Sequence, residues 1–134
     1  MKKLLFLLIF IVLTSCNQQI KESDLQYLNG YWEIEKVVTA DKNVKEYKIN
    51  TTYDYIEIKN FEGFRKKVYP QLMGNFQTND DSEIFKIIKE NGFFKMNYEN
   101  GENHWTEILE SVNETSFVVK NEANIIYHYK KVKN

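Results

Sequence analysis

The chain has 134 residues, of which 43% are hydrophobic, 15% aromatic and 28% charged, and its formal net charge is −1 at pH 7. Basic and acidic residues alternate along the chain, which excludes a basic face for nucleic acid and a charge block of the kind found in interaction tails. Because Cys16 is the single cysteine, the chain has no internal disulfide and must be stabilised by its apolar core.

The first fifteen residues have the pattern of an export signal. Lys2 and Lys3 precede an apolar run from Leu4 to Leu13, and small residues follow before Cys16. A helix needs about 20 apolar residues to span a bilayer, so this run is too short for a membrane anchor. We therefore predict that residues 1–15 are a signal peptide.

Leu13-Thr14-Ser15-Cys16 resembles the lipobox of bacterial lipoproteins. The resemblance implies cleavage before Cys16, a diacylglyceryl thioether on its sulfur and usually an N-acyl chain such as palmitate. Each buried methylene adds about 0.8 kcal/mol to membrane binding, so two or three chains would hold the protein at the membrane. The alternative is a free, exposed thiol, which is a liability in an oxidising compartment. Asn17 stands where some bacteria use Asp to retain lipoproteins at the inner membrane, so the resemblance favours the outer membrane of the cell envelope.

Residues 16–26 are predicted to be a flexible tether, because Asn17 to Asp24 is polar and nearly devoid of core-forming residues. Residues 27–134 are predicted to be one folded domain. In this part, apolar residues recur with period two, are rich in β-branched and aromatic types, and are interrupted at short intervals by Asn, Asp or Gly. This pattern predicts an all-β domain.

The first predicted strand carries Trp32 and Ile34 on one face and ends at a turn over residues 41–43. Residues 45–52 are either a short strand or a loop. Tyr53 to Lys59 is the second clear strand, with Ile56 and Ile58 on one face.

A longer extended stretch follows a turn at residues 60–63. One face of it is predicted to carry four apolar side chains: Phe64, Val68, Leu72 and Phe76. Pro70 cannot donate a backbone hydrogen bond, so it must mark an edge or a bulge. The polar run from Thr78 to Ser82 is predicted to be a loop.

The remaining predicted strands cover residues 83–89, 93–98, 104–112, 117–120 and 125–132. Asn91-Gly92 and Asn100-Gly101 favour tight hairpin turns, because both residue types readily adopt positive φ. About eight strands joined by short turns form an antiparallel meander, which loses its open edges by closing into an up-and-down β-barrel. A β-sandwich of the same strands is the alternative.

Leu28 to Ile34, with Gly30 and Trp32, resembles the Gly-x-Trp opening of the lipocalin superfamily. The resemblance implies a barrel whose closed end is filled by Trp32. It also places Lys130 or Lys131 where larger lipocalins often have an arginine over the tryptophan, and a lysine can make a cation–π contact there. Trp105 to Leu109, Ser116 to Val119 and the last strand with its tyrosines are similar to small lipocalin-like domains of bacterial lipoproteins.

This resemblance implies that the barrel binds a small apolar or amphipathic molecule. The expected lining is Phe64, Val68, Phe94 and Met96 on the inward faces, with Tyr127 and Tyr129 either lining the pocket or pairing across the sheet. A barrel of this size is also small enough to be filled by its own side chains. In that case the alternative function is a protein interaction module in the envelope.

The chain has no motif that indicates catalysis or a cofactor. There is no Gly-x-Ser-x-Gly elbow, His-Glu-x-x-His motif or phosphate-binding glycine loop, so we expect no enzymatic activity. His104 and His128 lack further ligands at a metal-binding spacing. Asp80, Asp81 and Glu83 lack the alternating ligands of a calcium loop, so we expect no metal site.

Overall fold

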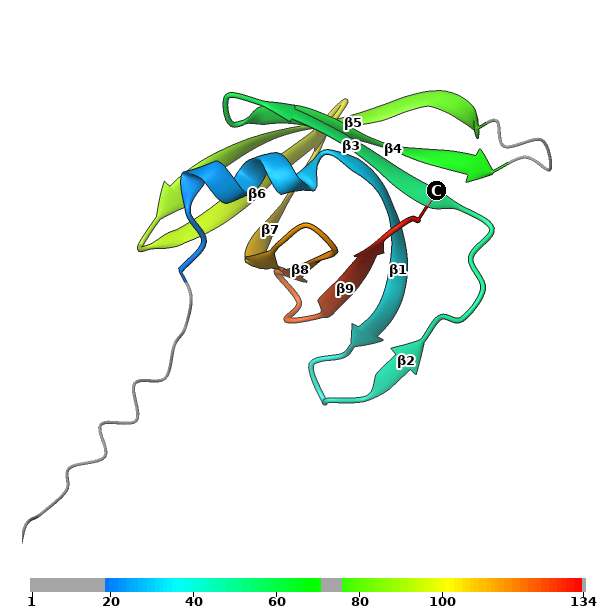
Figure 1. Cartoon of the computed structure of the whole chain (residues 1–134). Coiled ribbons are helices and arrows are strands. Elements are labelled where there is room, and N and C mark those ends of the chain that lie inside the picture. Colours follow the sequence, from blue (N-terminus) through cyan, green and yellow to red (C-terminus); the bar gives the residue numbers. More distant parts are fainter. Residues whose placement is uncertain (1–18, 71–75, 134) are drawn as a thin grey trace, which may run out of the picture.

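The computed structural model describes residues 19–70 and 76–133 and, for residues 76–80, the backbone alone. The predicted signal peptide and Cys16 lie outside the described residues, as do Leu72 and the side chain of Phe76. The described part is one antiparallel sheet preceded by a short 3₁₀ helix (Figure 1). In chain order the elements are η1 (Glu22–Leu28), β1 (Gly30–Val38), β2 (Val44–Glu46), β3 (Tyr53–Lys59), β4 (Glu62–Pro70), β5 (Phe76–Glu90), β6 (Phe93–Asn100), β7 (Asn103–Val112), β8 (Ser116–Asn121) and β9 (Ile126–Lys131).

The sheet closes on itself through β1. One edge of β1 pairs with β3 along Gly30–Trp32, and its other edge pairs with β9 from Trp32 to Val38. From β3 to β9 each strand pairs with the next one in the chain, so β1 and β3–β9 form an eight-stranded closed barrel. The predicted up-and-down barrel is therefore confirmed, and the sandwich alternative is excluded. The short β2 pairs with the second half of β1.

One predicted loop is part of a strand instead. Residues 78–82 belong to β5, where Thr78 pairs with Val68 and Ser82 pairs with Lys66. The polar composition of this run favours a loop, but the backbone of β4 pairs with both ends of the segment, and tertiary pairing overrides local propensity. Between these two pairs the register shifts by a bulge in β5, where residues 79–81 lie opposite the single residue Lys67.

The predicted tether is wrong from residue 20 onward, because the folded domain begins before Tyr27. Leu25 and Leu28 of η1 are buried, and Ile20 packs against the same core. A 3₁₀ helix has three residues per turn, so the two leucines lie on the same face. The carboxylate of Asp24 accepts a hydrogen bond from the backbone N–H of Lys21 at 2.9 Å and so stabilises the start of the helix.

Helix η1 lies across one end of the barrel (blue in Figure 1). It contacts β3 and β7, which stand on opposite sides of the closed sheet. The core fills the barrel beneath the helix with large side chains that are almost completely buried, among them Trp32, Phe85, Phe94, Met96, Leu109 and Phe117. This end of the barrel is closed.

Gly63 allows β3, β4 and β5 to approach closely. A Cβ atom at this position would lie 2.1 Å from the Glu57 carbonyl oxygen and 2.7 Å from Cζ of Phe85. We therefore expect Gly63→Ala to lower the free energy of unfolding by about 3 kcal/mol, because backbone must move to accept the methyl group. Urea denaturation measures this change.

Gly101→Asn is the matched control. Gly101 has a φ of +62°, which asparagine tolerates, and a Cβ atom added there would meet no atom within 4 Å. The control should change stability by less than about 0.5 kcal/mol. Equal effects of the two substitutions would contradict the close approach at Gly63.

Candidate ligand-binding site

Trp32 occupies the closed end of the barrel beside η1. Its indole Nε1 donates a hydrogen bond to the carbonyl oxygen of Leu28 at 2.8 Å, and the edge of Phe117 lies against its ring at 4.7 Å between centroids. Nζ of Lys131 lies 4.8 Å from the centre of the Trp32 ring and donates to the Asn29 carbonyl at 2.7 Å. These contacts fit the closing role that the resemblance implies for Trp32.

Of the two candidate lysines, Lys131 is therefore the one that covers the tryptophan. Lys130 instead pairs with Glu33 at 3.3 Å. Gly30 has a φ of +128°, and a Cβ atom there would lie 2.9 Å from Nζ and Cε of Lys131. Glycine at position 30 thus leaves room for the lysine over the ring.

The expected pocket lining is largely wrong. Phe94 and Met96 are buried in the packed core, and Val68 is buried outside the pocket lining. Phe64 lies on the outer face of β4, where its ring is 6.0 Å from that of Tyr55. The apolar pattern of β4 explains the error at Phe64. Arg65 is the register partner of the buried Ile56, so its position is the inward one, and the apolar Phe64 has the opposite parity.

A pocket of about 480 Å³ opens at the end of the barrel opposite η1. Helix η1 borders the turn after β3 at Asn60 and Phe61, whereas the pocket is lined by Asp54, near the other end of that strand. Three aromatic side chains contribute to the wall: Trp105, Tyr127 and Tyr129. The two tyrosines are therefore the expected residues that do line a pocket.

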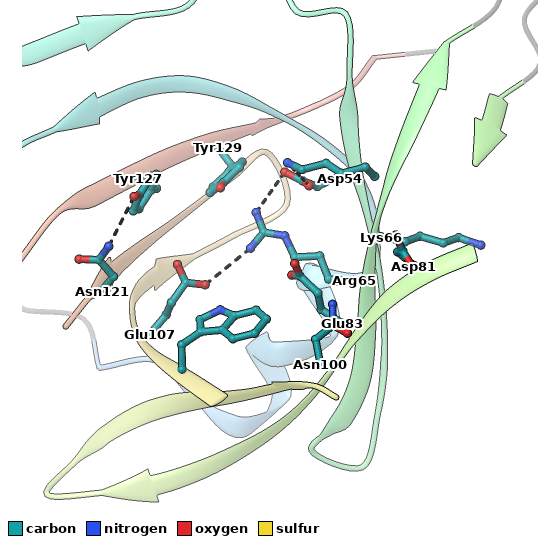
Figure 2. Close-up of a pocket in the computed structure, with 12 residues that line it drawn as sticks. Asp54, Arg65, Lys66, Asp81, Glu83, Asn100, Glu107, Asn121, Tyr127 and Tyr129 are labelled. Atoms are coloured by element: carbon teal, nitrogen blue, oxygen red, sulfur yellow. Dashed lines mark hydrogen bonds and ion pairs between the residues drawn. The ribbon is translucent and has the colours of Figure 1, made fainter. Parts of the chain in front are cut away.

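A cluster of charged side chains forms the floor of this pocket (Figure 2). Nη2 of Arg65 donates to Oδ2 of Asp54 at 3.0 Å, and Nη1 lies 3.7 Å from Oε1 of Glu107. Nη1 also donates to the hydroxyl of Tyr98 at 3.3 Å, and the guanidinium lies 4.8 Å from the ring centre of Tyr129. These groups come from five strands, so barrel closure is what brings them together.

Lys67 completes the cluster from the neighbouring position in β4. It is the register partner of Asp54, and its Nζ lies 2.7 Å from Oδ1 of that carboxylate. Burial alone would raise the pKa of Asp54, but the attraction of Arg65 and Lys67 outweighs burial and lowers it. Asp54 is thus held as a carboxylate by two cations.

Glu107 is in a different electrostatic position. Burial raises its pKa, and the attraction of Arg65 and a hydrogen bond with Tyr98 only partly oppose this effect. Burial also raises the pKa of Tyr129 to about 12. The floor of the pocket therefore contains one firmly ionised acid and one acid that accepts a proton more readily than a free carboxyl group.

The sequence analysis does not predict the charged cluster, although the alternation along two strands indicates two of its members. Asp54 has the same parity as Ile56 and Ile58 on β3, and Glu107 has the same parity as Leu109 on β7. Alternation alone therefore turns both carboxylates inward. Arg65 carries no such signal, because the apolar residues Phe64 and Val68 of the same strand have the opposite parity.

Neither a protein-family model nor a curated protein sequence matches this chain. One similar solved structure is that of a lipocalin-like protein from Bacteroides uniformis ATCC 8492, with 11% sequence identity and a TM-score of 0.48. The match covers 79% of this chain and 99% of that chain.

The described residues hold neither a membrane-spanning helix nor a metal-binding cluster. Among residues 19–70 and 76–133, no helix is long and apolar enough to cross a membrane. Within the same two ranges, no group of three or more His, Cys, Asp or Glu side chains is arranged to hold a metal ion.

Proposed function

We propose that this protein is a lipid-anchored, lipocalin-like lipoprotein of the bacterial cell envelope, which binds a small amphipathic ligand in the pocket opposite η1. The observation that carries the proposal is the 480 Å³ pocket, in which three aromatic side chains meet a buried charged cluster. Concave sites of some hundreds of Å³ with a few convergent polar groups are typical of small-molecule binding. The charged floor favours an amphipathic ligand over a purely apolar one.

The place of η1 determines how a barrel anchored at Cys16 would be oriented. The segment 17–21 separates Cys16 from η1, and a fully extended chain of this length spans roughly 20 Å. A lipid on Cys16 would therefore hold the closed end of the barrel near the membrane. The mouth of the pocket, at the opposite end, would face away from the lipid and remain accessible to ligand.

Cys16→Ser tests the anchor. The thiol is required for lipid attachment, so the variant should move from the membrane fraction to the soluble fraction of fractionated bacteria. Ser15→Ala, which retains a small residue before the cysteine, is the control and should stay with the membrane. If Cys16→Ser remains with the membrane, the lipid anchor is wrong.

A search for co-purified ligand tests the pocket. We would release the protein from membranes with a styrene–maleic acid copolymer, which avoids detergent, and analyse it by native mass spectrometry. We expect an added mass that is lost in Asn100→Trp, because the exposed Asn100 borders the pocket and a larger side chain would block it. An added mass that persists in this variant would place the ligand elsewhere.

A second candidate function is docking of a partner protein on the outer face of the barrel. Tyr55 and Phe64 form an outer aromatic row with Tyr31, whose ring lies 4.8 Å from that of Tyr55. Ile84, the register partner of Phe64, is 56% exposed. Phe64→Glu should abolish cross-linking of the protein to a partner in whole envelopes, and unchanged cross-linked products would reject this candidate.

A further inference from the structure

The buried charges at the pocket floor do not balance. Asp54, Arg65 and Glu107 are 3%, 7% and 8% exposed, so two carboxylates and one guanidinium share a nearly dry environment. Arg65 lies closer to Asp54 than to Glu107, and Lys67 also approaches Asp54. Glu107 therefore receives the smaller share of positive charge.

The groups around Glu107 increase this imbalance. It faces Arg65 on β4 and the Tyr98 hydroxyl on β6, and Glu83 on β5 adds a like charge. Asp54 on β3 and Tyr129 on β9 complete its titratable surroundings. Burial together with these acids raises the pKa of Glu107, so either a proton or a bound cation would stabilise this position.

The basic side chains at the pocket are already engaged. Arg65 and Lys67 both pair with Asp54. Lys66 points away from the pocket in Figure 2, and its Nζ lies 5.7 Å from the ring centres of Tyr55 and Phe64 on the outer face. An anionic ligand would have to displace an existing ion pair.

The aromatic wall beside Glu107 favours an organic cation. Trp105 precedes Glu107 by two positions on β7, so both side chains lie on the same face of the strand. The indole stacks on the ring of Tyr98, with centroids 5.4 Å apart and planes inclined by 6°, which fixes its orientation. Electron-rich indole and phenol faces attract ammonium groups, more strongly where water is excluded.

We propose that the pocket binds an organic cation, an ammonium group on an apolar chain, with its charge beside Glu107, Glu83 and the indole face of Trp105 and its chain against Tyr127. This inference rests on the proposed ligand-binding function and names the chemical class of the ligand. A bound cation would provide the positive charge that Glu107 lacks, because Arg65 lies closer to Asp54. A cationic ligand also explains why the carboxylate of Glu107 is buried at the open end of the barrel.

Isothermal titration with three probes of equal chain length tests the inference: octylammonium, 1-octanol and octanoate. We would use the full chain carrying Cys16→Ser, which alters no residue of the barrel. Octylammonium should bind at least about tenfold more tightly than 1-octanol, the size expected for a charged hydrogen bond, and octanoate should bind most weakly. If octanoate binds most tightly, or if all three bind equally, the inference is wrong while ligand binding stands. If none binds, the proposed ligand-binding function fails as well.

Glu107→Gln assigns the preference to one side chain. It should reduce the preference for octylammonium over 1-octanol to less than about threefold, because the amide keeps the shape but not the charge. Glu110→Gln is the matched control, since Glu110 lies on the same strand but pairs with Lys120 at 3.3 Å and is absent from the pocket lining. If Glu107→Gln does not fold, as judged by circular dichroism, Glu83→Gln should still weaken octylammonium binding. A full preference in a folded Glu107→Gln protein overturns the inference.

The pH dependence of ligand affinity distinguishes direct contact with the cation from a purely structural role of Glu107, which would leave this dependence unchanged. Octyltrimethylammonium keeps its charge at every pH, so a change in its affinity reports on the protein. Because a proton on Glu107 competes with the cation, affinity should fall as the pH is lowered, and Glu107→Gln should flatten this dependence. Equal pH profiles for the two proteins would overturn the role of Glu107.

Discussion

Replacing Arg65 by methionine is expected to lower the free energy of unfolding by about 3–5 kcal/mol, because it leaves two buried carboxylates without their guanidinium. Arg65 is the central member of the cluster, bonded to Asp54 and Tyr98 and close to Glu107. Methionine keeps most of the length of the side chain, so loss of charge dominates over loss of packing. Denaturation by urea at pH 7 measures the effect.

Two comparisons separate this effect from a general loss of a surface charge. Lys86→Met removes the ion pair with Glu62, in which both side chains are more than half exposed, and should cost less than about 0.5 kcal/mol. Adding Asp54→Asn to Arg65→Met should recover part of the lost stability. Equal costs for the buried and the exposed substitutions would contradict the structure of the cluster.

The pH dependence of stability should also differ between Arg65→Met and the native protein. In the native protein the pKa of Glu107 is raised, so its protonation stabilises the folded state as the pH is lowered from neutral. The lowered pKa of Asp54 acts only at lower pH, where its contribution is lost as the pH falls through the folded value. Without Arg65, the pKa of Glu107 rises further, because the attraction that opposes burial is lost. The variant should therefore gain more stability than the native protein as the pH is lowered from neutral toward the ordinary carboxyl range, and urea denaturation at several pH values measures this difference.

The second large effect is expected for Trp32→Phe, which should cost about 2–4 kcal/mol. Phenylalanine retains part of the contact with Phe117. The substitution removes the indole N–H that donates to the Leu28 carbonyl, however, and leaves a void beneath η1. The loss should also loosen η1, because Leu28 is the last residue of that helix. Hydrogen exchange of the η1 amides, together with urea denaturation, measures both consequences.

Trp105→Phe is the matched control, because these are the two tryptophans of the chain. Trp105 is half-buried at the open end, where Phe can retain the stacking on Tyr98. Trp105→Phe should lower the free energy of unfolding by less than about 1 kcal/mol and leave the hydrogen exchange of the η1 amides unchanged. A larger effect for Trp105 than for Trp32 would contradict the assignment of closed and open ends.

The overall fold was predictable because its signals are local and redundant. Period-two alternation and the Asn91-Gly92 and Asn100-Gly101 turns each indicate hairpins, and the positive φ of Asn91, Gly92 and Gly101 agrees with them. Closure follows from strand number and edge avoidance. The segment before Tyr27 was not predictable in the same way, because a 3₁₀ helix of seven residues leaves a short apolar pattern of two leucines.

The site was harder to predict because the inward face of β4 is not its apolar face. The apolar side chain of Phe64 assigns that position to the interior, whereas the register with β3 places Arg65 opposite the buried Ile56 and leaves Phe64 outside. A buried guanidinium has no hydrophobic signature, yet it is the side chain that reaches Asp54 and Glu107. The resemblance to lipocalins directs attention to Trp32, but it says nothing about a charged pocket floor.

The two indole Nε1–H signals in a nitrogen–proton correlation spectrum test the central claim most directly, that the barrel is closed at Trp32 and takes its ligand at Trp105. Octylammonium would be added stepwise to the full chain carrying Cys16→Ser, labelled with nitrogen-15, and Trp105→Phe would assign the two signals. We predict that the Trp105 signal shifts saturably while the Trp32 signal, held by its bond to Leu28, stays in place. A shift confined to Trp32 would contradict the account.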